Sequence, residues 1–238
     1  MFYLSITKPS SPTRRFLTRG MTALTLLVAL AYGPTAHAQL LNGSFETGNF
    51  TGVNPQAAAG ATQLFSGAIN IDNWTTVNAE LAWIGAGNPY AIVAPNGTRS
   101  LDLSGYHDGS PFGGVTQTIT TQPGATYNLS FMIGVFGGNT NSITATVAGV
   151  PTLRSFTGPA GGNQWGTVGF NFVASSANTA ISLIGQTATS QDYIGLDNVT
   201  VTLVQAANGP EPGTMALLIT GGVGFLLARR KRVLRSGV

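Results

Sequence analysis

Residues 114–133 read GVTQTITTQPGATYNLSFMI, and they decide the fold class. Polar and apolar residues alternate along Gly114–Thr120 and again along Thr126–Ile133, as they do in strands that bury one face. Between them, Thr121–Gly124 places a proline directly before a glycine, which is the order at the centre of a type II turn. The stretch therefore predicts two half-buried strands joined by a turn.

The same alternation recurs along the middle of the chain, and no long amphipathic helical stretch interrupts it. Short strands separated by Gly- and Asn-rich turns are typical of a sandwich, so the expected fold is all-β, a single jelly-roll β-sandwich. Two segments rich in glycine, alanine and proline, Gly52–Gly67 and Phe156–Asn163, are predicted as loops. Further strands are expected at Ser142–Val147, Val168–Val173, Ala180–Ile184 and Ile194–Val204.

The charged residues are segregated along the sequence. The chain has 238 residues and a formal net charge of +3, yet nine of its eleven basic residues lie before residue 21 or after residue 228. Arg99 and Arg154 alone remain between, together with seven of the eight acidic residues, so the middle carries a net charge of −5. Nucleic-acid binding needs a basic surface, so it is not expected of this protein.

The N-terminus has the three parts of a secretory signal peptide. Basic residues extend through Arg19, an apolar run covers Met21 to Tyr32, and the small residues Ala36 and Ala38 precede Gln39. Residues 1–38 are therefore predicted to be a signal peptide that is removed after Ala38. The chain contains no cysteine, but residues 39–209 are numerous enough to bury a core without disulfides, and they are predicted to form one β-sandwich ectodomain.

The C-terminus, residues 210–238, combines a short motif, a short apolar run and a basic end. Pro210-Glu211-Pro212 precedes fourteen mostly apolar residues, Met215–Ala228, and the tail continues with Arg229-Arg230. A helix that spans a bilayer needs about 20 apolar residues, so this predicted transmembrane helix is undersized for a permanent anchor. The basic cluster would stay on the cytoplasmic side.

This tail resembles the PEP-CTERM sorting signal of Gram-negative bacteria that produce exopolysaccharide. The resemblance implies that the exported protein pauses in the inner membrane and that an exosortase cuts near Pro210, Glu211 and Pro212. The short helix and the arginines, including Arg229 and Arg230, would then be a temporary handle. A plain single-pass anchor is the alternative.

A second resemblance covers most of the middle of the chain. Six motifs occur along it in this order: Asn42–Glu46, Trp74, Ser100–Gly105, Gly114–Thr118, Gly124–Phe131 and Leu196–Val201. The same order is seen in choice-of-anchor C family proteins, which this part of the chain resembles and whose outer domains resemble the galactose-binding-like jelly rolls of carbohydrate-binding modules. The resemblance implies a surface domain with no attached enzymatic activity. This sequence departs from the family pattern at Trp83–Asn88.

Candidate ligand-binding residues are the aromatic side chains Trp74, Trp83, Tyr106 and Trp165. An exposed ring can pack against the CH groups of a sugar, whereas a buried ring belongs to the core, which is the commoner role of aromatic residues. Exposure of these rings in one groove would favour glycan binding, and burial would favour a scaffold.

Catalysis is the less favoured interpretation, and no catalytic residue is predicted. A Ser-His-Asp hydrolase would have to use His107, without the Gly-x-Ser-x-Gly elbow that exposes a nucleophile. A glycoside hydrolase needs two opposed carboxylates, so it stays open as an alternative. Its candidates are Glu46, Glu80, Asp102 and Asp108.

A structural calcium ion is the predicted cofactor. Glu46 and Asp197 belong to the first and last strands expected, which commonly run close together in a jelly roll, and two carboxylates that meet would repel unless a cation bridges them. Calcium prefers such oxygen ligands, and Asn42 or Asn198 could complete the shell. The resemblance to carbohydrate-binding jelly rolls implies a calcium ion at a matching place. Alternatively, Glu46 caps a turn and Asp197 binds backbone amides.

Together these features predict an exported, exosortase-sorted, non-catalytic protein of the cell surface or extracellular matrix. It is expected to pass through the inner membrane, to associate with exopolysaccharide and to bind a glycan.

Overall fold

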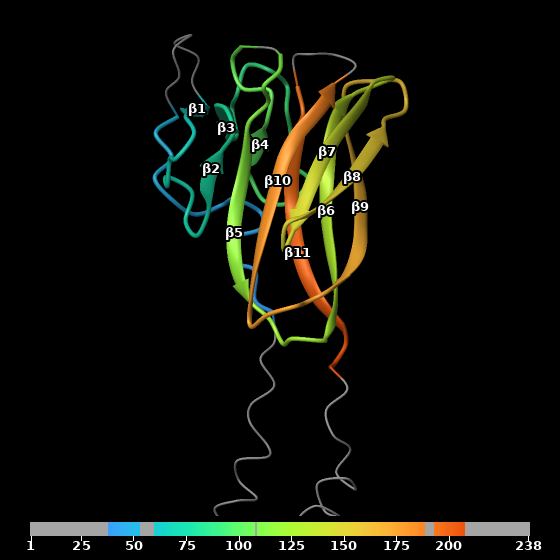
Figure 1. Ribbon diagram of the computed structural model, residues 1–238. Helices are drawn as coiled ribbons and strands as arrows, with labels where there is room; N and C mark the ends of the chain where they lie inside the picture. Colours follow the sequence, from blue (N-terminus) through green and yellow to red (C-terminus); the bar gives the residue numbers. More distant parts are fainter. Residues whose placement is uncertain (1–37, 53–59, 108, 189–192, 208–238) are drawn as a thin grey trace, which may run out of the picture. The chain divides into compact units, whose positions relative to one another are not determined.

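The computed structural model describes residues 38–52, 60–107, 109–188 and 193–207, which form two layers of antiparallel strands (Figure 1). Within these residues there are eleven strands and no helix, which confirms the all-β prediction. No helix in this part of the chain is long and apolar enough to cross a bilayer. The predicted sorting tail and residues 1–37 of the predicted signal peptide lie outside the described residues.

The strands occur in the following order. They are β1 (Ala61–Leu64), β2 (Thr75–Val77), β3 (Leu81–Ile84), β4 (Ser100–Asp102), β5 (Gly114–Thr120), β6 (Thr126–Phe136), β7 (Thr140–Val147), β8 (Val150–Thr157), β9 (Asn163–Val173), β10 (Asn178–Ala188) and β11 (Gly195–Gln205).

The strand pairing is that of a jelly roll. Strand β4 pairs with β11, β5 with β10, β6 with β9 and β7 with β8, so the eight strands form one long antiparallel ribbon that folds at the β7–β8 hairpin. Rolling this ribbon gives the order β4-β11-β6-β9 in one sheet and β5-β10-β7-β8 in the other. The remaining strands extend the edges: β3 and β1 join the first sheet and β2 joins the second.

The main core lies between the two sheets. Inward-facing residues alternate with outward-facing ones along the strands. The inward-facing residues include Val115 and Ile119 on β5 and Leu129, Phe131 and Ile133 on β6. A second cluster lies apart from it, around Tyr193 and Ile84, with partly buried aromatic rings packed against it. The period-2 pattern of the sequence therefore corresponds to an interior of apolar side chains between the two sheets.

The strands expected between Gly114 and Val204 are all present, with longer bounds in most cases. The first strand expected at Glu46 is wrong, because Glu46 lies outside any strand and the first strand, β1, begins at Ala61. The turn before β6 has the expected form: Ala125 donates its amide to the carbonyl of Gln122, and Gly124 has φ +81°. The predicted loop Gly52–Gly67 is wrong in part, because it contains β1. The predicted loop Phe156–Asn163 is too long, since β8 includes Phe156 and Thr157 and β9 begins at Asn163.

Candidate functional site

Trp74 and Trp83 are core residues, so the prediction that they offer ring faces to a sugar is wrong. Their exposed fractions are 2% and 0%. Each indole Nε1 donates to a backbone carbonyl, that of Asn42 for Trp74 (2.9 Å) and that of Phe45 for Trp83 (3.0 Å). Because these bonds satisfy the polar end of each ring, the rest of the ring can be buried at low cost.

Tyr106 and Trp165 are partly exposed, and both pack against the cluster around Tyr193. The Nε1 of Trp165 lies 2.8 Å from the carbonyl oxygen of Val93 and 2.8 Å from Oδ1 of Asn163. Its ring meets that of Tyr193 edge-on, at 6.2 Å between centroids. The four predicted aromatic residues therefore do not form one open platform, since two of them are in the core.

A different aromatic residue, Phe65, is the one that faces solvent beside a hollow. Its exposed fraction is 64%. Phe65 follows β1, and the turn Phe65–Ala68 holds it, because Ala68 donates to the carbonyl of Phe65 at 3.0 Å and Gly67 takes φ +88°. The buried hydroxyl of Thr76 also donates to that carbonyl. The sequence analysis missed Phe65 because a lone aromatic residue in a Gly- and Ala-rich segment carries no periodic signal.

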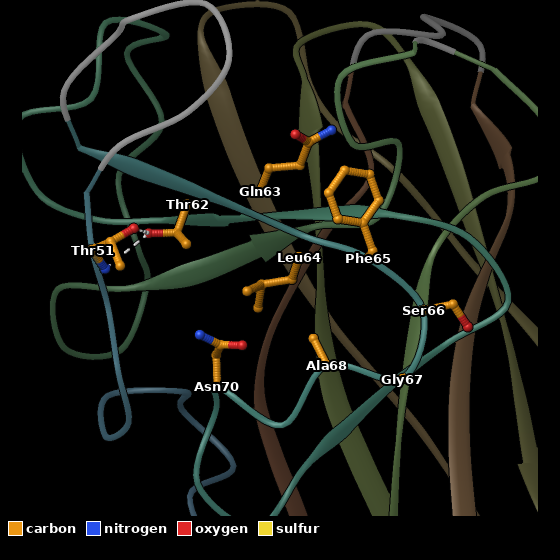
Figure 2. A pocket seen from close by; sticks show the side chains of 9 residues that line it. All are labelled: Thr51, Thr62, Gln63, Leu64, Phe65, Ser66, Gly67, Ala68 and Asn70. Atoms are coloured by element: carbon orange, nitrogen blue, oxygen red, sulfur yellow. Dashed lines mark hydrogen bonds between the residues drawn. The ribbon is translucent and has the colours of Figure 1, made fainter.

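The hollow has a volume of about 500 Å³ and runs along β1, at one end of the six-stranded sheet (Figure 2). Figure 2 shows Gln63 and Phe65 projecting from the same side of β1, as alternate residues of a strand do. Among the residues that the structure describes, none that lines it is charged. Its lining consists of amides, hydroxyls and small or apolar groups: Thr51, Thr62, Gln63, Leu64, Phe65, Ser66, Gly67, Ala68 and Asn70.

The side of the hollow formed by the chain before β1 is anchored through Thr62. The hydroxyl of Thr62 accepts hydrogen bonds from the amides of Thr51 (3.2 Å) and Gly52 (2.9 Å), and it lies 3.2 Å from the hydroxyl of Thr51. Gly52 in turn accepts from the amide of Gly60 at 3.2 Å. These bonds fix the chain before β1 against that strand, and the lining of the hollow combines an apolar ring with hydrogen-bonding groups.

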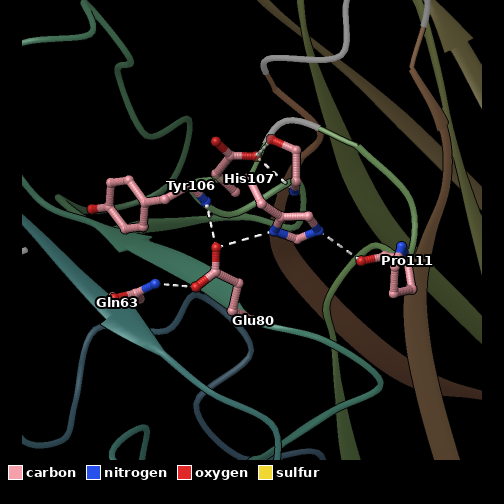
Figure 3. Close-up of polar contacts among 7 residues, drawn as sticks. Gln63, Glu80, Tyr106, His107 and Pro111 are labelled. Atoms are coloured by element: carbon pink, nitrogen blue, oxygen red, sulfur yellow. Dashed lines mark hydrogen bonds and ion pairs between the residues drawn. The ribbon is translucent and has the colours of Figure 1, made fainter. Parts of the chain in front are cut away.

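An ion pair adjoins the hollow (Figure 3). Nδ1 of His107 lies 3.0 Å from Oε1 of Glu80, and Nε2 of the same ring lies 2.9 Å from the carbonyl oxygen of Pro111. The amide of Tyr106 also donates to Oε1 of Glu80, at 3.0 Å. The side-chain amide of Gln63 donates to the other oxygen, Oε2. Glu80 therefore links the loop that carries His107 to a residue of the hollow.

The pKa values of both partners reflect this arrangement. Burial by itself would raise the pKa of Glu80, but hydrogen bonds from His107, Tyr106 and Gln63 outweigh it and lower the pKa. Burial would likewise lower the pKa of His107, but its bonds to Glu80 and to the Pro111 carbonyl raise it. Because both ring nitrogens face acceptors, His107 is set up as a cation and not as the base of a Ser-His-Asp triad.

Glu46 and Asp197, the predicted metal ligands, both bind backbone of the segment before β4. Oε1 of Glu46 accepts from the amides of Thr98 (2.9 Å) and Arg99 (2.8 Å). Asp197 is fully buried and accepts from the amides of Asn96 (3.3 Å) and Asn198 (2.6 Å). Burial raises the pKa of Asp197 to about 7, and the charge of Glu46 adds to the rise.

The donor set around these two carboxylates suits a hard cation only if carbonyl and amide oxygens complete it. Among the described residues there is no group of three or more His, Cys, Asp or Glu side chains that could hold a metal ion. A cation would, however, compensate the charge of Asp197, a fully buried carboxylate whose pKa burial raises. The hydrogen bonds are those of the alternative interpretation, in which Glu46 caps a turn and Asp197 binds backbone amides. The buried carboxylate of Asp197 is a group that a calcium ion could bind.

The remaining carboxylates considered for glycoside hydrolysis already accept hydrogen bonds. Buried Asp102 accepts from the amide and hydroxyl of Ser104 (3.0 and 2.7 Å) and from the amide of Ile194 (3.0 Å). Glu80 accepts through both oxygens, as described above. Asp108 lies outside the described residues.

Solved structures with similar folds share little sequence with this chain. A family 35 carbohydrate binding module from Clostridium thermocellum is 15% identical, with a TM-score of 0.41, and the match covers 59% of this chain and 97% of that one. TmCBM61 in complex with β-1,4-galactotriose is 17% identical, with a TM-score of 0.40 and coverage of 70% and 98%. An enzyme, exo-β-1,3-galactanase from Phanerochaete chrysosporium, is 20% identical, with a TM-score of 0.37 and coverage of 63% and 32%.

At these TM-scores the similarity carries no conclusion about a ligand, and the jelly-roll assignment rests on the strand pairing. A search among curated proteins found no match to the sequence. A family profile described as "Protein of unknown function (DUF642)" matches residues 38–202, which is more than half of the chain. The matched segment begins at the first described residue and extends into β11, the last strand. The chain therefore belongs to the DUF642 family.

Proposed function

We propose that this protein is an exported, non-catalytic surface or matrix protein that binds a neutral polysaccharide in the hollow along β1. The observation that carries the proposal is an exposed Phe65 ring beside uncharged hydrogen-bonding side chains, Gln63, Ser66 and Asn70 among them. A pyranose ring presents apolar CH groups on its faces and hydroxyls at its rim. Sites for such ligands combine an apolar surface with a few placed polar groups.

The charge of the site favours neutral sugars over acidic ones. The described residues that line the hollow are all uncharged, and the middle of the chain carries a net charge of −5. A polyanionic glycan would be repelled by this net charge and would find no basic partner in the hollow. Exopolysaccharides with largely uncharged sugars are therefore the favoured ligands.

The route to the surface is the second part of the proposal. The N-terminal pattern of residues 1–38 and the tail that begins at Pro210-Glu211-Pro212 support export followed by exosortase sorting. The choice-of-anchor C resemblance supports the same route, since that family combines similar outer domains with different sorting tails. The protein would pass through the inner membrane of a Gram-negative bacterium and reach the cell surface or matrix.

The third part is a structural calcium ion held by Glu46 and Asp197. Asn198, whose Oδ1 accepts from Asn96 at 3.0 Å, offers a further oxygen near the same segment. When bound, the ion would supply positive charge to a buried carboxylate and tie the segment before β4 to β11. It would have a structural role, since these residues line a different region from the hollow.

The binding proposal is tested with a Phe65→Ala variant. The purified protein is titrated with neutral and acidic polysaccharides by calorimetry, and loss of the ring is expected to weaken binding of a neutral polymer at least tenfold. Leu153→Ala is the matched control, because Leu153 is 54% exposed on β8 and does not line the hollow.

Three results would contradict the proposal. Binding that Phe65→Ala leaves unchanged would remove the hollow as the site, and no binding across the panel would leave a structural role. Release of reducing ends that is lost in Glu46→Gln or Asp108→Asn would instead identify a glycoside hydrolase.

A further inference from the structure

We propose that His107 and Glu80 position the side chain of Gln63 in the hollow, so that the charge state of His107 controls ligand binding there. This inference rests on the proposed glycan-binding function. It assigns a role to an ion pair that lies next to the hollow and is linked to it by hydrogen bonds (Figure 3).

The first step is that the loop after β4 holds Glu80 in place. Oε1 of Glu80 accepts from the amide of Tyr106 and lies within 3.0 Å of His107 Nδ1. The loop closes over Glu80 because Gly105 has no side chain: a Cβ there would lie 2.9 Å from Cγ of Glu80, and its φ is +68°. The side chain of Glu80 is 13% exposed, so this carboxylate is largely shielded from water.

The second step concerns the orientation of Gln63. With Oε1 engaged by the loop, Oε2 of Glu80 accepts a hydrogen bond from Nε2 of Gln63. An ionised carboxylate accepts hydrogen bonds and donates none, so it selects the orientation in which the NH₂ group faces Glu80. The carbonyl oxygen of Gln63 then lies on the other side of the amide, where it can accept a bond from a sugar hydroxyl.

The third step is the dependence on protonation. The carbonyl of Pro111 and the carboxylate of Glu80 are both acceptors, so His107 can satisfy both only when both ring nitrogens carry a proton. Among the described residues, Glu80 is the charged group that faces the ring. When His107 loses a proton, one bond breaks, and the positive charge that holds Glu80 disappears.

The direction of the effect follows from the two pKa values. The pKa of Glu80 is lowered, so its carboxylate stays ionised from pH 5 upward, while the pKa of His107 is raised above its ordinary value of 6.5. The cationic form therefore persists to higher pH than that of an ordinary histidine, and the hold on Gln63 loosens as the pH rises above the pKa of His107. Ligand affinity is expected to fall about fivefold across that transition, the equivalent of one hydrogen bond.

The test uses two variants of one residue. In His107→Asn the amide nitrogen takes the place of Nδ1 and keeps a donor toward Glu80, whereas in His107→Gln it takes the place of Nε2 and keeps a donor toward Pro111 alone. We expect the wild type to lose affinity for its polysaccharide between pH 6 and 9. Both variants lack the positive charge, so both should bind about fivefold more weakly than the cationic wild type at all these pH values. Binding by His107→Asn as strong as that of the cationic wild type would contradict control by the charge.

A spectroscopic measurement tests the positioning without any ligand. The side-chain amide signals of Gln63, assigned by comparison with Gln63→Glu, should shift in ¹⁵N NMR spectra with the same midpoint as the ring protons of His107. The shift should be absent in both His107 variants. If the Gln63 signals do not follow His107, or still titrate in His107→Gln, the inference is wrong. If they follow His107 but no polysaccharide binds at any pH, the positioning holds and the proposed function fails.

Discussion

The backbone amide of Asn96 donates a hydrogen bond of 3.3 Å to the buried carboxylate of Asp197, 101 residues further along the chain. This contact joins the segment before β4 to the last strand. Asn198, the next residue, has φ +50°, and the pairing of β11 with β6 is irregular between Asp197 and Thr200. A short polar residue tolerates this backbone conformation, so the chain can turn its amide toward the carboxylate of Asp197.

The pH dependence of stability should report on Asp197. Its folded pKa of about 7 lies above the ordinary value of 3.8, so the folded state favours the protonated form. The resulting stability is complete below about pH 4 and is lost as the pH rises toward 7, at about 1.4 kcal/mol for each unit of pKa difference. With a chelator present, Asp197→Asn should be less sensitive to pH than the wild type from pH 4 to 8. Denaturation curves of both proteins would measure this, and parallel pH profiles would contradict it.

Calcium should stabilise the wild type more than it stabilises Asp197→Asn. A bound ion compensates the buried charge and stabilises the wild type, by about 2.7 kcal/mol at one hundred times its Kd. Asp197→Asn and Glu46→Gln should respond weakly, because each lacks a ligand charge. The measurement is thermal unfolding at pH 8 with calcium or with excess chelator. A wild-type midpoint that is the same in both conditions would exclude the ion.

Trp83 should be far more important for stability than Phe65, although both are large aromatic residues. Trp83 is fully buried and packs edge-on against Phe50 at 5.1 Å between centroids. Trp83→Ala should cost about 3–5 kcal/mol through the cavity it leaves. Phe65→Ala should stay within about 0.5 kcal/mol, since that ring is exposed. Urea denaturation of the two variants gives the comparison, and similar losses would show that Phe65 is part of the core.

Arg154 should protect an open sheet edge. Strand β9 ends the six-stranded sheet, and Arg154 on β8 donates from Nε to the carbonyl of Gly169 at 3.1 Å, while its guanidinium lies 4.8 Å from the centroid of Phe170. Unprotected edges pair with other chains. Arg154→Ala should therefore associate at lower protein concentration than the wild type. Light scattering measures this, with Arg154→Lys as the control that keeps the charge. Equal association of wild type and Arg154→Ala would contradict the role.

The mature protein should have new ends at both termini. Removal of the signal peptide predicts an N-terminus at Gln39, and exosortase cleavage predicts a C-terminus near Pro210-Glu211-Pro212. Intact-mass spectrometry of the protein from the extracellular fraction of its host reports both. Recovery of a chain that still carries Arg232 would contradict the sorting proposal.

The local alternation of apolar and polar residues was sufficient to predict the strands that bury one face. In β5 and β6 the alternation of apolar and polar residues follows the alternation of inward and outward faces, and the Pro123-Gly124 turn depends on the backbone preferences of those two residues. Strand β8 was missed because its alternate residues are at most half-buried, so Val150, Leu153 and their neighbours carry no clear pattern. Strand β1 was missed because a short strand within a Gly- and Ala-rich segment offers too few residues to show a period.

The candidate site depended on contacts between residues far apart in sequence. Composition and period 2 determine that the chain forms a two-sheet β-structure, because both act through neighbouring residues. Whether an aromatic ring is buried depends on what the fold packs against it. Trp83 donates to a carbonyl 38 residues away and lies in the core, whereas a turn holds Phe65 in solvent. The link from His107 through Glu80 to Gln63 likewise forms when the loop after β4 reaches the start of β3 and the edge strand β1. Such long-range contacts have no signal in the local sequence of the residues that make them, so the tertiary structure alone decides them.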